Sequence, residues 1–218
     1  MAQETEIKLK IGDVRAFHRV LKRIGARPAG VGTGRVHEEN VIFDTPEGGL
    51  AKHGQLLRIR TETPEVRAKA KSAQATQRIV VTFKQPLAQQ GVSDFRRATH
   101  GRYKVRDEIE VEVSETANLT KIFEGLGMSG WFRYEKFRTT FRLPSSKAWA
   151  RELLIELDET PIGTFGEIEG QPQWIDSTAR RLSISVDQYL KESYSELFAA
   201  WKRKTRSKAT EMTFKAVK

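Results

Sequence analysis

The chain has 218 residues, a formal net charge of +10 and no cysteine. Its length suits one large domain or two small ones, and the missing thiol excludes a disulfide, a thiolate metal site and a cysteine nucleophile. No apolar run could cross a bilayer, and the N-terminus lacks the apolar stretch of a signal peptide. We therefore expect a cytoplasmic protein without a membrane partner.

The positive charge is unevenly distributed. Residues 67–106 contain ten Lys or Arg against one acid, and residues 202–218 contain seven against one, so the rest of the chain is net acidic. A protein that binds nucleic acid through its phosphates needs a basic surface and gains nothing from acidic rows. We therefore do not expect nucleic acid to be the partner.

In chain order, the first predicted element is a strand over residues 4–10, ETEIKLK, in which charged and other residues alternate. A helix is predicted over 14–25, because Asp13 is a suitable N-cap and apolar residues follow at helical spacing. Strands are next predicted over 35–43 and 55–62.

The middle of the chain combines strands with polar connections. The polar segments 63–77 and 85–101 are expected to be long loops on either side of a strand over 78–84. A strand over 103–113 alternates almost without fault, and a helix is predicted over 116–126.

The last third begins with three predicted strands, over 133–143, 150–160 and 163–170. Helices are predicted over 175–190 and 193–204. Eight strands in mostly hairpin order, with a few helices, predict one α+β domain built around an antiparallel sheet or barrel.

Charged residues recur on one face of several predicted strands, because alternate side chains of a strand share a face. These rows are Glu4, Glu6 and Lys8; Arg58 and Arg60; Glu108, Glu110 and Glu112; Lys136 and Arg138; Glu156 and Asp158; and Glu167 and Glu169, while Lys84 ends its strand alone.

Two arrangements fit these rows. In the first, an ordinary sheet has an apolar inner face and carries ion pairs on its wet outer face. In the second, a closed barrel is apolar outside, under the helices, and charged inside. Paired acids would then bind a divalent cation, while Arg and Lys would bind phosphate oxygens. Together they meet the needs of a triphosphate, whose cleavage depends on positioning and charge neutralisation.

The segment ETEIK resembles the ExExK signature of the CYTH superfamily, the triphosphate tunnel metalloenzymes. The motifs VIFDT, LLRIR, TFK, RDEIEVEV, EKFR, IELD and GEIEG follow in order, so the resemblance spans residues 4–169. SYSELF near the end is similar to the last helix of class IV adenylyl cyclase-like members. The resemblance implies an eight-stranded antiparallel barrel, open at both ends, over residues 1–200, with a basic tail over 201–218.

The resemblance also implies roles for individual residues. Mg²⁺ or Mn²⁺ would be held by Glu4, Glu6, Glu156, Asp158, Glu167 and Glu169. The triphosphate would be bound by Lys8, Arg58, Arg60, Lys84, Lys136 and Arg138. The catalytic candidates are Lys8, Glu108 and Glu110. For the family's lysine near the tunnel mouth, the sequence offers Lys191.

Three functions are compatible with this reading. The first is a class IV adenylyl cyclase-like enzyme, which converts ATP to cyclic AMP and pyrophosphate and is favoured by the wording of the motifs. The second is a phosphohydrolase for inorganic triphosphate or thiamine triphosphate. The third is a non-catalytic module that binds polyphosphate or RNA, against which the acidic rows argue. A homodimer is compatible with the family, although no patch in the sequence establishes one.

Overall fold

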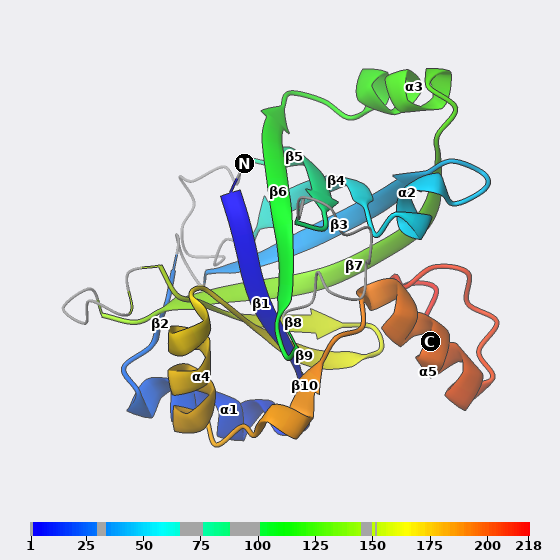
Figure 1. Ribbon diagram of the computed structural model, residues 1–218. Coiled ribbons are helices and arrows are strands. Elements are labelled where there is room, and N and C mark those ends of the chain that lie inside the picture. The colour runs from blue at the N-terminus through cyan, green and yellow to red at the C-terminus, as the bar shows by residue number, and fades with distance from the viewer. Residues whose placement is uncertain (1, 30–33, 66–75, 88–100, 145–149, 151) are drawn as a thin grey trace.

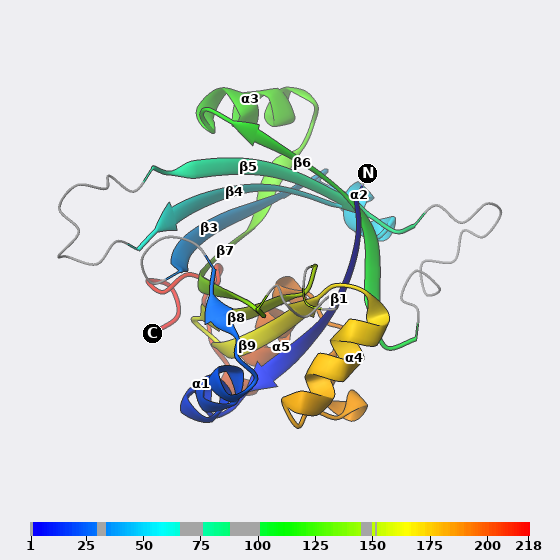
Figure 2. The same cartoon turned by 90° about the vertical axis from the view of Figure 1, so that its left-hand side faces the viewer.

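The computed structural model describes residues 2–29, 34–65, 76–87, 101–144, 150 and 152–218. Within them, eight long strands close into an antiparallel barrel in the order β1-β6-β5-β4-β3-β7-β8-β9, with β9 pairing back to β1 (Figures 1 and 2). The strands are β1 (Ala2–Ile11), β3 (Arg35–Asp44), β4 (Leu56–Pro64), β5 (Arg78–Gln85), β6 (Lys104–Val113), β7 (Ser129–Arg142), β8 (Leu154–Thr160) and β9 (Gly163–Glu169). The predicted α+β barrel is confirmed.

Strand β1 closes the ring because it pairs on both edges. Residues 2–6 pair with β6, whereas residues 6–11 pair with β9. Two short strands extend the sheet beside the ring: β2 (Arg27–Pro28) pairs with β7, and β10 (Tyr189–Leu190) pairs with β1.

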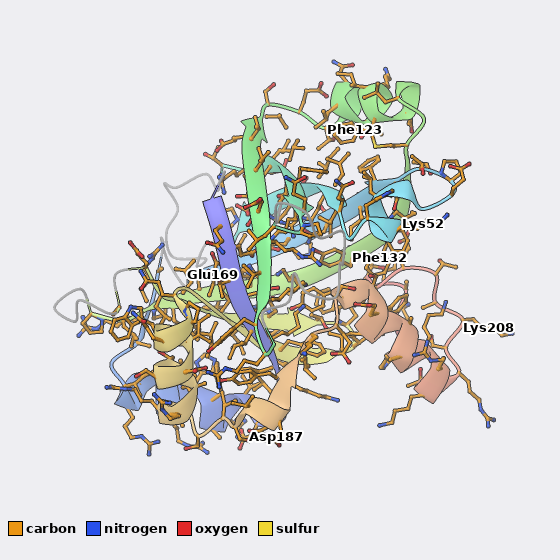
Figure 3. The ribbon with its side chains drawn as sticks, viewed as in Figure 1. Lys52, Phe123, Phe132, Glu169, Asp187 and Lys208 are labelled. Carbon is orange, nitrogen blue, oxygen red and sulfur yellow. The ribbon has the colours of Figure 1, made fainter. Side chains whose placement is uncertain are left out.

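The helices pack outside the barrel, as Figure 2 shows along its axis. Helices α1 (Val14–Arg23) and α4 (Pro172–Arg181) cover the face formed by β1, β7, β8 and β9, and helix α3 (Ala117–Gly125) covers the outer face of β3 to β5. Phe123 of α3, labelled in Figure 3, packs edge-on against Phe43 of β3. A short helix, α2 (Gly49–Lys52), links β3 to β4.

Alternation along β1 and β9 sends apolar side chains outward to these helices and charged side chains inward. Ile7 and Ile168 are 1% and 0% exposed in the core beneath α1 and α4. Lys8 and Glu167, their chain neighbours, instead line the interior. Burial of the outer apolar face stabilises the barrel by removing that surface from water.

Some element boundaries differ from the sequence prediction. The helix predicted over 175–190 is wrong beyond Arg181, where α4 ends, because Ser183 has φ of 60° and breaks the helix. A 3₁₀ turn (Val186–Gln188) and β10 follow instead. Strand β8 begins only at Leu154, and most of the predicted loops at 63–77 and 85–101 lie outside the described residues.

The C-terminal region packs against one end of the barrel (Figure 1). Helix α5 (Tyr194–Thr205) begins before the predicted boundary at residue 200 and continues past it. Met212 then forms a parallel bridge to Tyr134 of β7 and is fully buried. The segment predicted as a tail is therefore helical at its start and anchored by Met212. No helix among the described residues is long and apolar enough to cross a membrane.

Candidate active site

The barrel encloses a cavity of about 660 Å³ with a charged wall. Charged side chains reach it from every strand of the ring, because each strand turns one of its two faces inward. The predicted residues that line it are Glu4, Glu6, Lys8, Arg58, Arg60, Lys84, Glu108, Glu110, Lys136, Arg138, Glu156, Glu167 and Glu169. The inward-facing rows predicted from the sequence are thus brought together, except for Glu112 and Asp158, which do not line the cavity.

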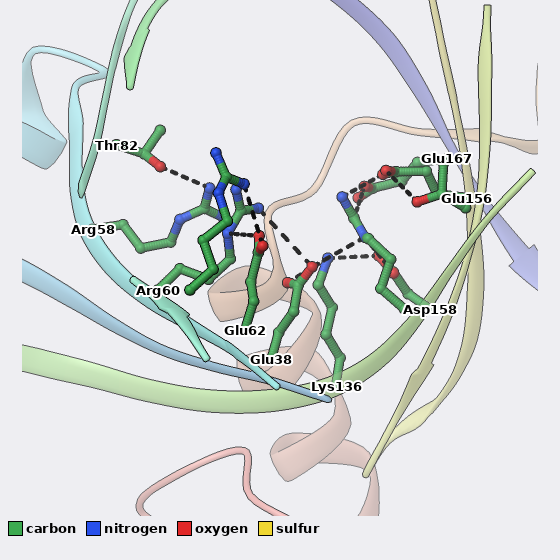
Figure 4. A network of polar contacts seen from close by, with 12 residues as sticks. Glu38, Arg58, Arg60, Glu62, Thr82, Lys136, Glu156, Asp158 and Glu167 are labelled. Atoms are coloured by element: carbon green, nitrogen blue, oxygen red, sulfur yellow. Dashed lines mark hydrogen bonds and ion pairs between the residues drawn. The ribbon is translucent and has the colours of Figure 1, made fainter. Parts of the chain in front are cut away.

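One side of the cavity carries the two arginines of β4 (Figure 4). Arg58 donates to Thr82 Oγ1 at 3.1 Å and to Tyr134 Oη at 3.3 Å. Arg60 donates to Glu110 Oε1 at 3.1 Å. Both guanidinium groups are at least nine-tenths buried but border the cavity, so they are held in place by neutral or carboxylate acceptors on the wall.

The opposite side is organised around Asp158 of β8. This carboxylate accepts from Lys136 Nζ at 2.8 Å, from Arg138 Nε at 2.8 Å and from Tyr194 Oη at 2.7 Å. It is 0% exposed and does not line the cavity. Asp158 was predicted as a metal ligand, but its oxygens are engaged by these protein donors behind the wall.

Arg138 also joins two acids that do line the cavity. It forms a short ion pair with Glu156, and its Nη2 lies 2.5 Å from Glu167 Oε2. Burial and the neighbouring Asp158 raise the pKa of Glu156 to about 8. Burial also disfavours the charge of Glu167, yet Arg138 and Lys8 lower its pKa well below the usual range. The pair therefore holds a proton on Glu156 more readily than on Glu167.

Four further acids gather where β1, β6 and β9 meet. Lys84 Nζ lies 2.7 Å from Glu4 and 3.1 Å from Glu108, and Lys104 Nζ lies 3.3 Å from Glu6. Burial, with Glu4 and Glu6 nearby, raises the pKa of Glu169 to about 7. The two lysines therefore neutralise only part of the negative charge that the four acids can carry here.

These oxygens fit a divalent cation by their chemistry. Mg²⁺ and Mn²⁺ prefer carboxylate oxygens. The pKa of Glu169 is raised first by burial and then by repulsion from Glu4 and Glu6, and a nearby cation would oppose both effects. Within the described part of the chain, no three His, Asp or Glu side chains are grouped tightly enough to hold a metal as they stand. The ammonium groups of Lys84 and Lys104 lie against the acids instead.

Sequence reasoning missed several residues of the site. Lys104 and Arg106 line the cavity and continue the inward row of Glu108 and Glu110, so the alternation of β6 could have identified them. Glu38 was missed because it is followed by Glu39, which hides the phase of its strand. Lys191, by contrast, is exposed and does not line the cavity.

The N-terminal turn of α5 also reaches the cavity, and sequence reasoning did not place it there. The lining residues from this turn are Ser193, Tyr194, Ser195 and Glu196. Lys8 Nζ donates to the carbonyl of Glu192 at 3.1 Å, so the segment leading into α5 is bound to the barrel wall.

The comparison with known families agrees with this geometry. A model of the CYTH domain matches residues 2–192, which is most of the chain. The chain belongs to the CYTH domain family. The charged cavity and the eight-stranded ring described above are therefore those of a CYTH protein.

Relatives of this CYTH chain include a Methanocaldococcus jannaschii protein provisionally named an adenylate cyclase. It is 24% identical over 199 residues, which are 89% of this chain and 97% of that protein. A solved structure from Vibrio parahaemolyticus, also provisionally named an adenylate cyclase, has a TM-score of 0.64 and 17% identity, covering 90% of this chain and 97% of its own.

A Hippeastrum structure is provisionally called an adenylyl cyclase and described as having a dominant triphosphatase activity. It has a TM-score of 0.56 and 22% identity, covering 90% of this CYTH chain and 95% of its own. At these identities the solved structures show a shared fold.

The stability of the metal-free protein should depend on Glu169. Its pKa is raised from 4.5 to about 7, so the fold favours the protonated form. The protonated Glu169 therefore contributes fully to the free energy of unfolding below about pH 4.5, and this contribution is lost as the pH rises through 7. We expect the Tm to fall by a few degrees between pH 5 and pH 8, and to fall less in Glu169→Gln. Thermal unfolding followed by circular dichroism measures both, and equal falls would contradict the assignment.

Proposed function

We propose that this CYTH protein is a divalent-metal-dependent enzyme that binds a triphosphate inside the barrel and breaks one of its phosphoanhydride bonds. The observation that carries the proposal is the charge layout of one enclosed cavity. Basic side chains from five strands, β1, β4, β5, β6 and β7, converge there, and acids from β1, β6 and β9 gather beside them. A polyphosphate chain with a bound cation needs both kinds of group.

The bases would hold the phosphate oxygens. Arg58, Arg60 and Arg138 present planar donors that suit two oxygens at once, whereas Lys8, Lys84 and Lys136 act as point charges. Asp158 fixes the directions of Lys136 and Arg138 by the hydrogen bonds described above. We therefore assign Asp158 to positioning these cations.

The acids would hold Mg²⁺ or Mn²⁺. The carboxylates proposed for this are Glu4, Glu6, Glu156, Glu167 and Glu169. Such an ion, when bound, neutralises charge on the phosphates as the bond breaks. Glu6 and Glu167 are the best suited of the set, because the pKa of each is lowered by neighbouring cations and both stay ionised.

The first candidate reaction is the conversion of ATP to cyclic AMP and pyrophosphate. The ribose 3′-hydroxyl attacks the α-phosphorus, the bond to the β-phosphate oxygen breaks, and pyrophosphate leaves. Burial raises the pKa of Glu108, which makes its carboxylate a suitable acceptor for the hydroxyl proton. Glu110 is held by Thr82 and Arg60 instead. The name of the Methanocaldococcus jannaschii relative supports this reaction.

The second candidate is hydrolysis of a triphosphate, in which water attacks the terminal phosphorus, the bond from that phosphorus to the bridging oxygen breaks, and phosphate and a diphosphate are released. The same cradle and the same proton acceptor serve both reactions. The description of the Hippeastrum structure, which states a dominant triphosphatase activity, supports this candidate. The substrate would be inorganic triphosphate, thiamine triphosphate or a nucleotide.

One experiment tests the proposal and separates the candidates. The purified protein is incubated with ATP, tripolyphosphate or thiamine triphosphate, each with Mg²⁺, Mn²⁺ or a chelator, and cyclic AMP, pyrophosphate and phosphate are quantified. Cyclic AMP identifies the cyclase, and phosphate from tripolyphosphate or thiamine triphosphate identifies the hydrolase. Salt-sensitive RNA binding without any metal-dependent product would instead support the non-catalytic module and refute the proposal.

A further inference from the structure

Glu38 is a buried acid at the centre of the basic cradle. It lies on β3, is 2% exposed and points into the barrel between the arginines of β4 and the basic residues of β7 (Figure 4). The functional roles above do not use it. Burying an ionised carboxylate costs free energy unless other groups compensate its charge, so the contacts of Glu38 need to be explained.

The contacts of Glu38 are long. Its oxygens lie 3.4 Å from Lys136 Nζ, 3.6 Å from Arg138 Nε and 4.0 Å from an Nη of Arg60, and its Oε2 accepts no hydrogen bond within the described residues. Asp158, in contrast, holds Lys136 and Arg138 at 2.8 Å or less. Asp158 therefore fixes the cations, whereas Glu38 supplies negative charge without taking up their donors.

The negative charge of Glu38 is permanent in the working pH range. Burial opposes its ionisation, but Lys136, Arg138 and Arg60 lower its pKa to about 2. A carboxylate that faces these three cations also faces any anion bound by them. It attracts the cradle and repels the polyphosphate at the same time.

We propose that Glu38 is a built-in counter-anion that weakens the hold of the cradle on polyphosphate, so that the product can leave. This inference rests on the proposed function. A site built only from cations would bind the substrate and the polyphosphate product with similar, high affinity. Such uniform binding lowers the energy of both complexes and does not speed turnover. Glu38 offsets part of that attraction. When no anion is bound, it also reduces the repulsion among the neighbouring cations.

Binding of inorganic tripolyphosphate and pyrophosphate without metal tests the inference. Titration calorimetry would compare the wild-type chain with two variants. Glu38→Gln removes the charge but keeps the shape of the side chain. Glu38→Asp keeps the charge on a side chain that is one methylene group shorter. We expect Glu38→Gln to bind both anions roughly tenfold more tightly, and Glu38→Asp to lie between it and the wild type.

The matched control is Glu39→Gln. Glu39 is the next residue of the same strand, faces outward and pairs with Arg133 at 3.0 Å, so its replacement should leave both affinities unchanged. If Glu38 served only the fold, either Glu38 variant would bind more weakly or equally, which would overturn the inference. Glu38→Asp gives this answer even if Glu38→Gln does not fold. Failure of the wild-type chain to bind either anion, both without metal and with Mg²⁺, would overturn the proposed function together with the inference. If the wild-type chain bound them only with Mg²⁺, the same variants would be compared in Mg²⁺ with the same expected order.

Discussion

Replacing Arg138 with methionine is expected to lower kcat/KM for the triphosphate substrate by roughly 100- to 1000-fold. The same change should lower the free energy of unfolding by about 3–5 kcal/mol, because it leaves buried carboxylates without their shared partner. Arg138 lies beside Glu156, Asp158 and Glu167 at once. Product assays give the first quantity, and urea unfolding followed by fluorescence gives the second.

Arg133→Met is the matched control for this prediction. Arg133 lies on the same strand, but it faces outward, and its side chain is 48% exposed and pairs with Glu39. Exposed ion pairs contribute about 0–1 kcal/mol, so this variant should keep its activity and nearly all of its stability. Equal losses of kcat/KM and of unfolding free energy in the two variants would show that the position of Arg138 inside the barrel gives it no special role.

Replacing Glu6 with glutamine should lower the metal-dependent activity by roughly 100-fold or more. The loss should come without unfolding, because functional charges commonly cost stability. Glu6 is paired with Lys104, whose pKa burial has already lowered to about 8, so that this lysine can lose its proton cheaply when the partner is gone. Activity measured against Mg²⁺ concentration, with thermal unfolding in parallel, checks both parts.

Glu124→Gln provides the comparison for Glu6. Glu124 is an exposed residue of α3, outside the barrel, and its loss should change neither the Mg²⁺ dependence nor the Tm. If Glu6→Gln kept the wild-type response to Mg²⁺, the acids of β1 would have no part in holding the cation.

The period-two pattern of the sequence was enough to predict which charged side chains share a face in most strands, but not that this face points inward, which the family resemblance implied. Lys8 between Ile7 and Leu9 is an example, since the structure buries both apolar residues outside and lines the cavity with the lysine. The depth of a residue along the barrel could not be predicted. Glu156 and Asp158 share a face, yet only Glu156 reaches the cavity, because neighbouring donors engage Asp158.

Other features depended on interactions that no local pattern contains. Glu38 is defined by cations from β4 and β7, which lie far from it in the chain. The helix predicted over 175–190 ends early because Ser183 adopts a left-handed conformation that helical spacing does not reveal. The choice between cyclase and hydrolase is likewise absent from the motifs, because both reactions need the same cradle.

The pairing of β1 on both edges has a consequence for how the protein folds. Among the strands of the ring, β1 comes first in the chain, yet one of its neighbours, β9, comes last. Closure must therefore wait until the chain through Glu169 is available, and such distant pairing is slow. Because Glu4 and Glu6 lie on this strand, the same late event that seals the barrel also assembles the acids of the site, and partly folded chains should be inactive.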